Sequence, residues 1–407
     1  MRQKTYKDTR SACYAGFITQ AIINNLAPLF FALFQKQYGI SLEKISFLIL
    51  LNFGTQLVTD VVCGQLADKW GHRTMLMIAH ICSALGLLCL GILPEMMGYG
   101  GLLVSVVIYA VGSGLIEVMV SPIASALPGN ESAASMSILH SFYCWGHLGV
   151  VLVTTFLLLV LGEGSFRVIC VLWALVPISN IYFFATVPLP AQQKSKKSSA
   201  RALFRHKTFI WMVLLMVFAG ASEQAMAQWV SLFAENGLHV SKVIGDLLGP
   251  CMFAALMGLG RMLYGMLGEK IAVSKMLSIS GILCAGCYLL ASLAKSPVLA
   301  LAACALVGFS VSIMWPGTIS YCAGIFPGGG MAMFSLLALG GDIGCSIGPW
   351  AAGMVSEIAQ RSSSLMRWGL QQGWDQMQLG LKSGLLVAVI FPLGLWFCMR
   401  HIRKTSR

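Results

Sequence analysis

Apolar runs of roughly 20 residues or more recur along the whole length of the chain. A helix rises about 1.5 Å per residue, so about 20 apolar residues are needed to cross a hydrocarbon layer about 30 Å thick. Each run therefore predicts a helix that crosses a membrane. Twelve runs are assigned, at 11–35, 45–66, 74–93, 100–126, 133–161, 166–187, 209–234, 243–267, 273–293, 298–322, 331–356 and 381–399.

The composition excludes a soluble globular domain. Hydrophobic residues make up 57% of the 407 residues, and charged residues make up only 10%. A single core in a protein of this size could not bury that much apolar surface, so lipid must cover the rest. The sequence therefore predicts an all-α membrane protein.

The basic residues predict how the chain is oriented. Lysine and arginine near the ends of spans tend to stay in the cytoplasm, and most of them fall on one side if twelve spans alternate. Both termini are therefore expected in the cytoplasm, in a multi-pass protein of the inner (plasma) membrane without a cleaved signal. The net charge of +12 is read as this topology signal rather than as a nucleic-acid surface. The basic segments are residues 2–10, 69–73, 194–207, 270–275 and 400–407.

A repeat divides the chain into two similar halves. The string GQLADKWGHR at 64–73 is echoed in its first half by GMLGEK at 265–270, about half the chain length later. The strings GHLG at 146–149 and GDIG at 341–344 are a second matching pair. Duplicated bundles of this kind hold a solute near mid-membrane and work by rocking one half against the other. The predicted parts are a six-helix half at 1–187, a Ser- and Lys-rich linker at 188–208 and a second six-helix half at 209–407.

The longest connection on the opposite side of the membrane is expected at 357–382. Its charged residues argue against burial in lipid, and its spaced leucines and tryptophans suggest a short helix at the membrane surface.

The string GQLADKWGHR resembles the cytoplasmic signature of the major facilitator superfamily. The resemblance implies two six-helix halves and a cytoplasmic gate in which Asp68 and Arg73 help to close that side. Gly64 and Gly71 would allow a tight turn there, and Asp68 could cap a helix or pair with a base. Glu269 is the acidic residue of the second copy and is assigned to the same gate. The alternative is an ordinary solvated loop.

Several further strings resemble the fucose permease group of proton-coupled sugar symporters. They are GLIEVMVSPIASALPGNES (114–132), MWPGTIS (314–320) and LGGDIGCSIGPWAAGMVSE (339–357), while GASEQAMAQW (220–229) resembles the seventh span of related glucose transporters. Two departures matter. Asn24, Asn25 and Leu26 are followed by Ala27 and Pro28, where the group usually has a carboxylate, and Asp342 stands where it more often has glycine. The proton mechanism of the group therefore cannot simply be transferred.

Acidic residues inside spans are the main candidates for function, because a charge at the centre of a spanning helix costs about 2.5–3.5 kcal/mol. Glu117 is the strongest candidate for a proton site. Ser113, Glu117, Ser121 and Ser125 recur every four residues and form one polar stripe, as expected of a helix face that lines a wet cavity. The alternative is a neutral carboxyl group in a structural hydrogen bond.

His147 in the first half and Asp342 in the second occupy equivalent positions in the matching strings GHLG and GDIG. They are predicted to form a proton relay or a gate pair. His140, Tyr143 and His147 share one helix face, and Tyr143 is assigned to the solute site. The alternative for this face is a polar packing seam.

Amide, carboxylate and aromatic groups gather in the seventh span. Such groups suit a polyol, which needs several hydrogen-bond partners and a flat surface for its C–H faces. Gln20 is a further candidate for a cavity contact in the first span, and Trp315, beside a helix break at Pro316, rests mainly on the resemblance. The predicted solute-binding residues are Asn24, Asn25, Tyr143, Glu223, Gln224, Gln228, Trp229 and Trp315.

Asp60 and Arg261 lie at matching positions, each four residues before the glycine that begins its loop motif. Their opposite charges suggest a latch at the cytoplasmic side. The alternative is that each pairs within its own half.

These features favour proton-driven uptake of a sugar or similar polar solute. The alternative is proton-driven export of amphipathic compounds, but the proline typical of the fifth span of drug antiporters is missing from SFYCWGHLGVV at 141–151. No catalytic constellation appears at mechanistic spacing, so an enzyme is not expected, although a sensor derived from a transporter stays open. Cys284 and Cys287 are read as packing residues, and no cofactor or metal is expected. The expected partners are a small solute, protons or sodium, and the bilayer, with the protein a monomer.

Overall fold

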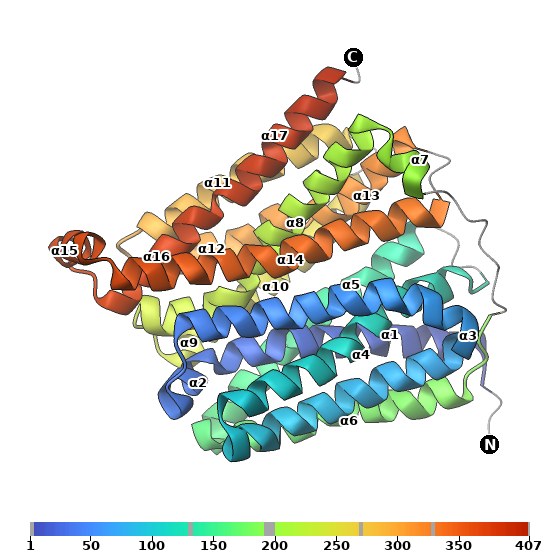
Figure 1. Cartoon of the computed structure of the whole chain (residues 1–407), viewed down its shortest axis with the longest axis horizontal. Helices are drawn as coiled ribbons and strands as arrows, with labels where there is room; N and C mark the ends of the chain where they lie inside the picture. The colour runs from blue at the N-terminus through green and yellow to red at the C-terminus, as the bar shows by residue number, and fades with distance from the viewer. Residues whose placement is uncertain (1–3, 129–132, 191–199, 268–271, 327–329, 406–407) are drawn as a thin grey trace. The chain divides into compact units, whose positions relative to one another are not determined.

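The computed structural model describes residues 4–128, 133–190, 200–267, 272–326 and 330–405, and no strand occurs among them (Figure 1). The longer helices of the first part of the chain are α1 (Tyr6–Leu26), α2 (Phe31–Tyr38), α3 (Leu42–Met97), α4 (Tyr99–Ser125), α5 (Ala133–Leu161) and α6 (Phe166–Thr186). Those that follow are α7 (Ala200–Phe204), α8 (Lys207–Leu232), α9 (Lys242–Asp246), α10 (Met252–Leu267), α11 (Val273–Leu293), α12 (Pro297–Val311), α13 (Met314–Ile325), α14 (Gly330–Arg361), α15 (Ser363–Gln371), α16 (Gln376–Ala388) and α17 (Ile390–Thr405). Short 3₁₀ or π turns are η1 (Ala27–Phe30), η2 (Glu163–Ser165), η3 (Phe233–Gly237) and η4 (Leu247–Cys251).

Eleven helical segments of the described chain are long and apolar enough to cross a membrane. They coincide with eleven of the twelve predicted runs, so the prediction of an all-α multi-pass membrane protein is confirmed. The run predicted at 331–356 lies within α14, which has 32 residues and would span about 48 Å. It is not among the eleven.

Prolines lie at helix breaks in the first and tenth spans. In the first span, Pro28 stands in the 3₁₀ turn η1 that separates α1 from α2. In the tenth, α12 ends at Val311 and α13 begins at Met314, with Pro316 in its first turn. Proline lacks an N–H and is tolerated in a first helical turn, so the chain breaks just before it. The break predicted beside Pro316 is confirmed.

Gly71 makes the turn between the second and third predicted spans. The assigned helix α3 runs through both, but Gly71 has φ 76° and ψ 154°, which is not helical. Residues with a Cβ rarely adopt a positive φ of this size, so glycine is required at this position. The tight turn predicted at Gly71 is thus confirmed, and it follows directly from the signature string.

The chain divides into two compact units, one made of residues 1–40 and 51–193 and the other of residues 41–50 and 194–407. In the first unit, α1 packs against α4, α5 and α6. In the second unit, α8 packs against α14 and α17, and α14 packs against α16 (Figure 1). Most of the polar residues considered below lie on these helices and on α3.

Glycines bring α8 and α14 into backbone contact. A Cβ built on Gly344 would lie 2.0 Å from the carbonyl oxygen of Val217, and one built on Gly220 would lie 2.3 Å from that of Gly341. Small residues allow membrane helices to approach this closely, where dispersion contacts hold them together. The glycine-rich string at 339–357 therefore has a packing function in addition to any role in the site.

The connection predicted at 357–382 contains the short helix α15, as expected. The side chain of Ser362 caps α15 by accepting the Leu365 N–H, and Asp375 caps α16 by accepting the Gln378 N–H at 2.8 Å. Leu370 and Trp368 on α15 are exposed, which agrees with the suggested surface helix.

Candidate functional site

Glu117 lies on α4 and is held by an amide from α1. The Gln20 side-chain Nε2 donates to Glu117 Oε2 at 2.7 Å, and Gln20 is buried. On the same face, one turn earlier, the Ser113 hydroxyl donates to Gln56 Oε1 on α3 at 2.8 Å. The helix predicted to carry the polar stripe is observed as α4. The role of Glu117 as a proton site stays a prediction.

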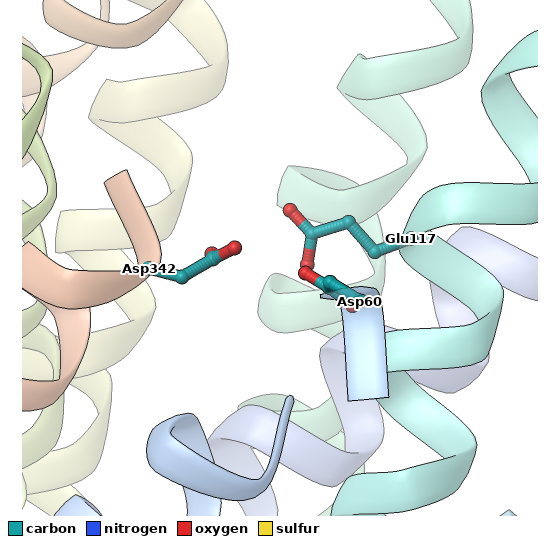
Figure 2. A group of neighbouring side chains, drawn as sticks. All are labelled: Asp60, Glu117 and Asp342. Carbon is teal, nitrogen blue, oxygen red and sulfur yellow. The ribbon is translucent and has the colours of Figure 1, made fainter. Parts of the chain in front are cut away.

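Asp60 is the neighbour of Glu117 on α3. A carboxylate oxygen of each residue lies within 4.8 Å of the other, and Figure 2 shows the two groups directed toward one another. Gly114 makes this approach possible, because a Cβ on that residue would lie 2.9 Å from Asp60 Oδ1. Asp342, also drawn in Figure 2, is a buried residue of α14 and belongs to the second unit.

A closed network of amides joins α1 and α3. Asn24 Oδ1 accepts from Asn52 Nδ2 at 3.3 Å and from Gln56 Nε2 at 2.9 Å, and Gln56 also donates to Asn52 Oδ1. The two lone pairs of the Asn24 oxygen are thus occupied. Asn52 and Gln56 were not predicted, although their spacing of four residues in an apolar span would have marked a polar face.

Residues of α5 reach back to α1. The Asn25 side chain donates to Tyr143 Oη at 3.3 Å, and the His140 ring packs edge-on against Phe17. His147 is buried in the same helix. Tyr143 and His140 thus both contact α1, while the polar face and the relay predicted for His147 stay predictions.

In the second unit, a chain of polar groups runs along α8 toward Glu223. Gln228 Nε2 donates to Gln224 Oε1 at 3.1 Å, and Gln224 Nε2 lies 3.4 Å from Glu223 Oε1. Arg261 of α10 pairs with the other oxygen of Glu223 at 3.7 Å. Arg261 thus has an ionic partner within its own half, which is the second of the two alternatives that the sequence left open.

The two predicted tryptophans differ in their surroundings. The Trp229 indole is buried and donates its Nε1–H to the Pro349 carbonyl at 2.8 Å, so the ring is fixed against α14. Trp315 is half-buried, and its ring lies over Gly341, where a Cβ would come within 2.2 Å of it. Trp315 therefore packs against the turn of α14 that carries Asp342.

A second cluster of charged and polar side chains, at the end of α8 and in α9, was not predicted. Lys242 Nζ lies 2.9 Å from Asp246 Oδ2 and donates to Ser231 at 2.8 Å, while Ser231 donates to Asp246 Oδ1 at 2.6 Å. Asp246 is almost fully buried. Lys242 and Asp246 are four residues apart, so the helical ion-pair spacing was visible in the sequence.

The gate residues are only partly described. Arg73 donates to the carbonyl oxygens of Phe184, Ala185 and Val187 at 2.6–2.8 Å, which caps the end of α6. Glu269 and the side chain of Asp68 lie outside the described residues, and Gly64 lies within α3. The predicted action of Asp68 with Arg73 stays a prediction.

The two cysteines of the ninth span, Cys284 and Cys287, are buried free thiols. Both lie on α11 among the packed apolar residues of the second unit. This placement agrees with their interpretation as packing residues.

Comparison with known proteins identifies similar chains. The family model described as Major Facilitator Superfamily matches residues 12–349. A multi-drug resistance efflux pump, PmrA of Streptococcus pneumoniae, is 23% identical over 88% of this chain and 91% of its own length.

Solved structures share the fold. A bacterial homologue of the human lysosomal transporter Spinster superimposes with a TM-score of 0.79 and 15% identity over 98% of this chain and 97% of its own. The E. coli fucose:proton symporter FucP has a TM-score of 0.64 and 16% identity over 97% and 98% of the two chains.

Proposed function

The chain belongs to the Major Facilitator Superfamily of transporters, and we propose that it takes up a small polyhydroxyl solute, such as a sugar, together with protons. Family membership also agrees with the expectation that the chain is not an enzyme. The observation that carries the proposal is the half-buried Glu117 carboxylate, which accepts a 2.7 Å hydrogen bond from Gln20 inside a spanning helix. An acid in this position must have a function or a partner to offset its cost in lipid.

The amides of the second unit support a hydroxyl-bearing solute. Gln224 and Gln228 each offer both a donor and an acceptor, and the Glu223 carboxylate offers acceptors. Hydroxyl groups donate and accept, so they are complementary to such a set. Trp315, half-buried on α13, supplies a flat apolar surface for C–H faces.

The proposed transport cycle follows the general scheme for duplicated bundles. The solute and a proton bind near mid-membrane, and the two six-helix halves rock around them to alternate access. Both termini face the cytoplasm of the inner membrane in this proposal, as the basic segments favour. His147 with Asp342 would relay or gate the proton, and Asp68, Arg73 and Glu269 would close the cytoplasmic side.

The second candidate is proton-driven export of amphipathic compounds. It is favoured by the resemblance to PmrA, which is named as a multi-drug resistance efflux pump. The two candidates predict opposite proton movements when solute enters, so the direction of flux separates them.

A thermal-shift screen tests the solute class. Purified protein is heated with sugars, polyols, nucleosides, organic acids and amphipathic cations in turn, at several pH values. A ligand that binds only the folded protein raises the unfolding temperature. Stabilisation by sugars or polyols is expected, and stabilisation confined to amphipathic cations would contradict sugar uptake.

Alanine at Gln224 is expected to weaken binding of the stabilising solute. Loss of one hydrogen bond costs about 0.5–1.5 kcal/mol, which corresponds to roughly 2- to 12-fold weaker binding in a solute titration of the thermal shift. Glu223→Ala should weaken it by at least as much. Ser222→Ala is the matched control, because the Ser222 hydroxyl donates to the Phe218 carbonyl of its own helix at 2.7 Å. Solute binding by this variant should be unchanged. Unchanged binding in Gln224→Ala and Glu223→Ala would remove both residues from the site.

A further inference from the structure

The geometry of the first unit points to Asp60 as the second carboxyl group of the proton site, where it shares one proton with Glu117. This assignment rests on the proposed proton coupling, and it moves Asp60 from the cytoplasmic gate to the coupling site. It is carried by three features of α1, α3 and α4: the crossing at Gly114, the proximity of the two acids, and the buried amide of Gln20.

Gly114 opens the space in which Asp60 lies. A Cβ on Gly114 would approach Asp60 Oδ1 to 2.9 Å and the Gln56 carbonyl oxygen to 3.0 Å. Gly114 and Glu117 are three residues apart on α4 and so share one helix face. The absence of a side chain at 114 therefore lets the Asp60 carboxyl group lie against the turn that carries Glu117.

The distance between the two acids favours a shared proton. Carboxylate oxygens of Asp60 and Glu117 lie within 4.8 Å of each other. Two negative charges at that distance repel each other. One proton on the pair removes this repulsion, as in other carboxyl pairs that share a site. Titratable residues on the helices packed around the pair include Tyr14 on α1, Cys63 on α3, and His140, Tyr143 and His147 on α5.

The side chain of Gln20 is independent evidence for a proton donor beside Glu117. Its Nε2 is fixed by donation to Glu117, and it is 4% exposed. Its Oε1 is buried and has no hydrogen-bond partner among the described residues. Buried acceptors are normally satisfied, so a donor is expected beside this atom when the site is loaded.

Loading the pair is a simple proton transfer. A proton from the aqueous cavity forms an O–H bond with one oxygen of Asp60 or Glu117, and that O–H donates a hydrogen bond either to the other carboxylate or to Gln20 Oε1. On release the O–H bond breaks and the proton returns to water on the other side. The second carboxylate thus strengthens proton binding without any change in solute contacts.

Infrared difference spectroscopy between acid and alkaline buffer tests the assignment without any solute. The C=O band of a protonated carboxyl group is followed in wild type, Asp60→Asn, Asp60→Glu and Glu117→Gln. At the pH where half of the wild-type band remains, Asp60→Asn is expected to reduce it about fivefold, which corresponds to a shift of about one pH unit. Glu117→Gln, which also removes one carboxyl group of the pair, should reduce the band at that pH, and Asp60→Glu, which keeps a second carboxyl group, should retain most of it.

Glu95→Gln is the control, because Glu95 is an exposed acid of the same unit paired with Arg167. It should leave the band unchanged. If Asp60→Asn shows a C=O band as large as that of wild type at the pH where half of the wild-type band remains, the assignment is overturned. Because no solute is present, this failure is distinct from failure of the thermal-shift screen, which would contradict the solute class alone.

Discussion

Replacing Glu117 with glutamine is expected to abolish uphill accumulation while leaving exchange of pre-loaded solute intact. Glutamine keeps a hydrogen-bond partner for Gln20, whose amide lies 2.7 Å from the carboxylate, but it cannot carry a proton. A difference of one pH unit supplies about 1.4 kcal/mol per proton, enough for about tenfold accumulation with one coupled proton. In the variant, the ratio of internal to external solute in proteoliposomes should fall to about one.

The control is again Glu95→Gln, which removes an exposed carboxylate from the same unit. It should accumulate solute as wild type does, and both proteins should exchange labelled for unlabelled solute. Accumulation by Glu117→Gln at the wild-type ratio would rule out Glu117 as the coupling residue.

The second large effect is expected from Gly344→Ala. The added Cβ would lie 2.0 Å from the Val217 carbonyl oxygen, and a backbone atom cannot move aside as a side chain can. Overpacking of this kind costs about 1–3 kcal/mol, and a backbone obstacle favours the upper part of that range. The helices α8 and α14 should separate slightly, and the unfolding temperature of the purified protein should fall.

Gly286→Ala is the matched control. Gly286 lies on α11, and a Cβ added there would have no heavy atom of a neighbouring element within 4 Å. Alanine also favours a helix by about 1 kcal/mol over glycine. The unfolding temperature of this variant should therefore equal or exceed that of wild type. A Gly344→Ala protein as stable as Gly286→Ala would contradict the close packing of α8 and α14.

The spans could be predicted because hydropathy and helix length are local properties. The run at 331–356 could be predicted too, and it is observed within the helix α14. Gly71 was likewise predictable, since a glycine between two apolar runs indicates a turn, and its positive φ confirms this. These features depend on residues that are near one another in the sequence.

Partners distant in the sequence could not be predicted. The repeat placed Asp60 and Arg261 at matching positions, but it does not determine how each helix is rotated about its axis. The structure shows Arg261 facing Glu223 at 3.7 Å and Asp60 beside Glu117. Similarly, Arg73 belongs to the signature string, yet the carbonyl groups that it caps lie more than 100 residues later.

Solute-driven proton movement in proteoliposomes tests the central claim most directly. Wild-type protein is reconstituted with a pH-sensitive dye in the lumen, and the sugar that most stabilises it is added outside. Uptake with protons predicts that the lumen becomes more acidic in wild type and stays unchanged with Glu117→Gln. A lumen that becomes more alkaline, as in antiport, or does not change in wild type would contradict proton-coupled uptake.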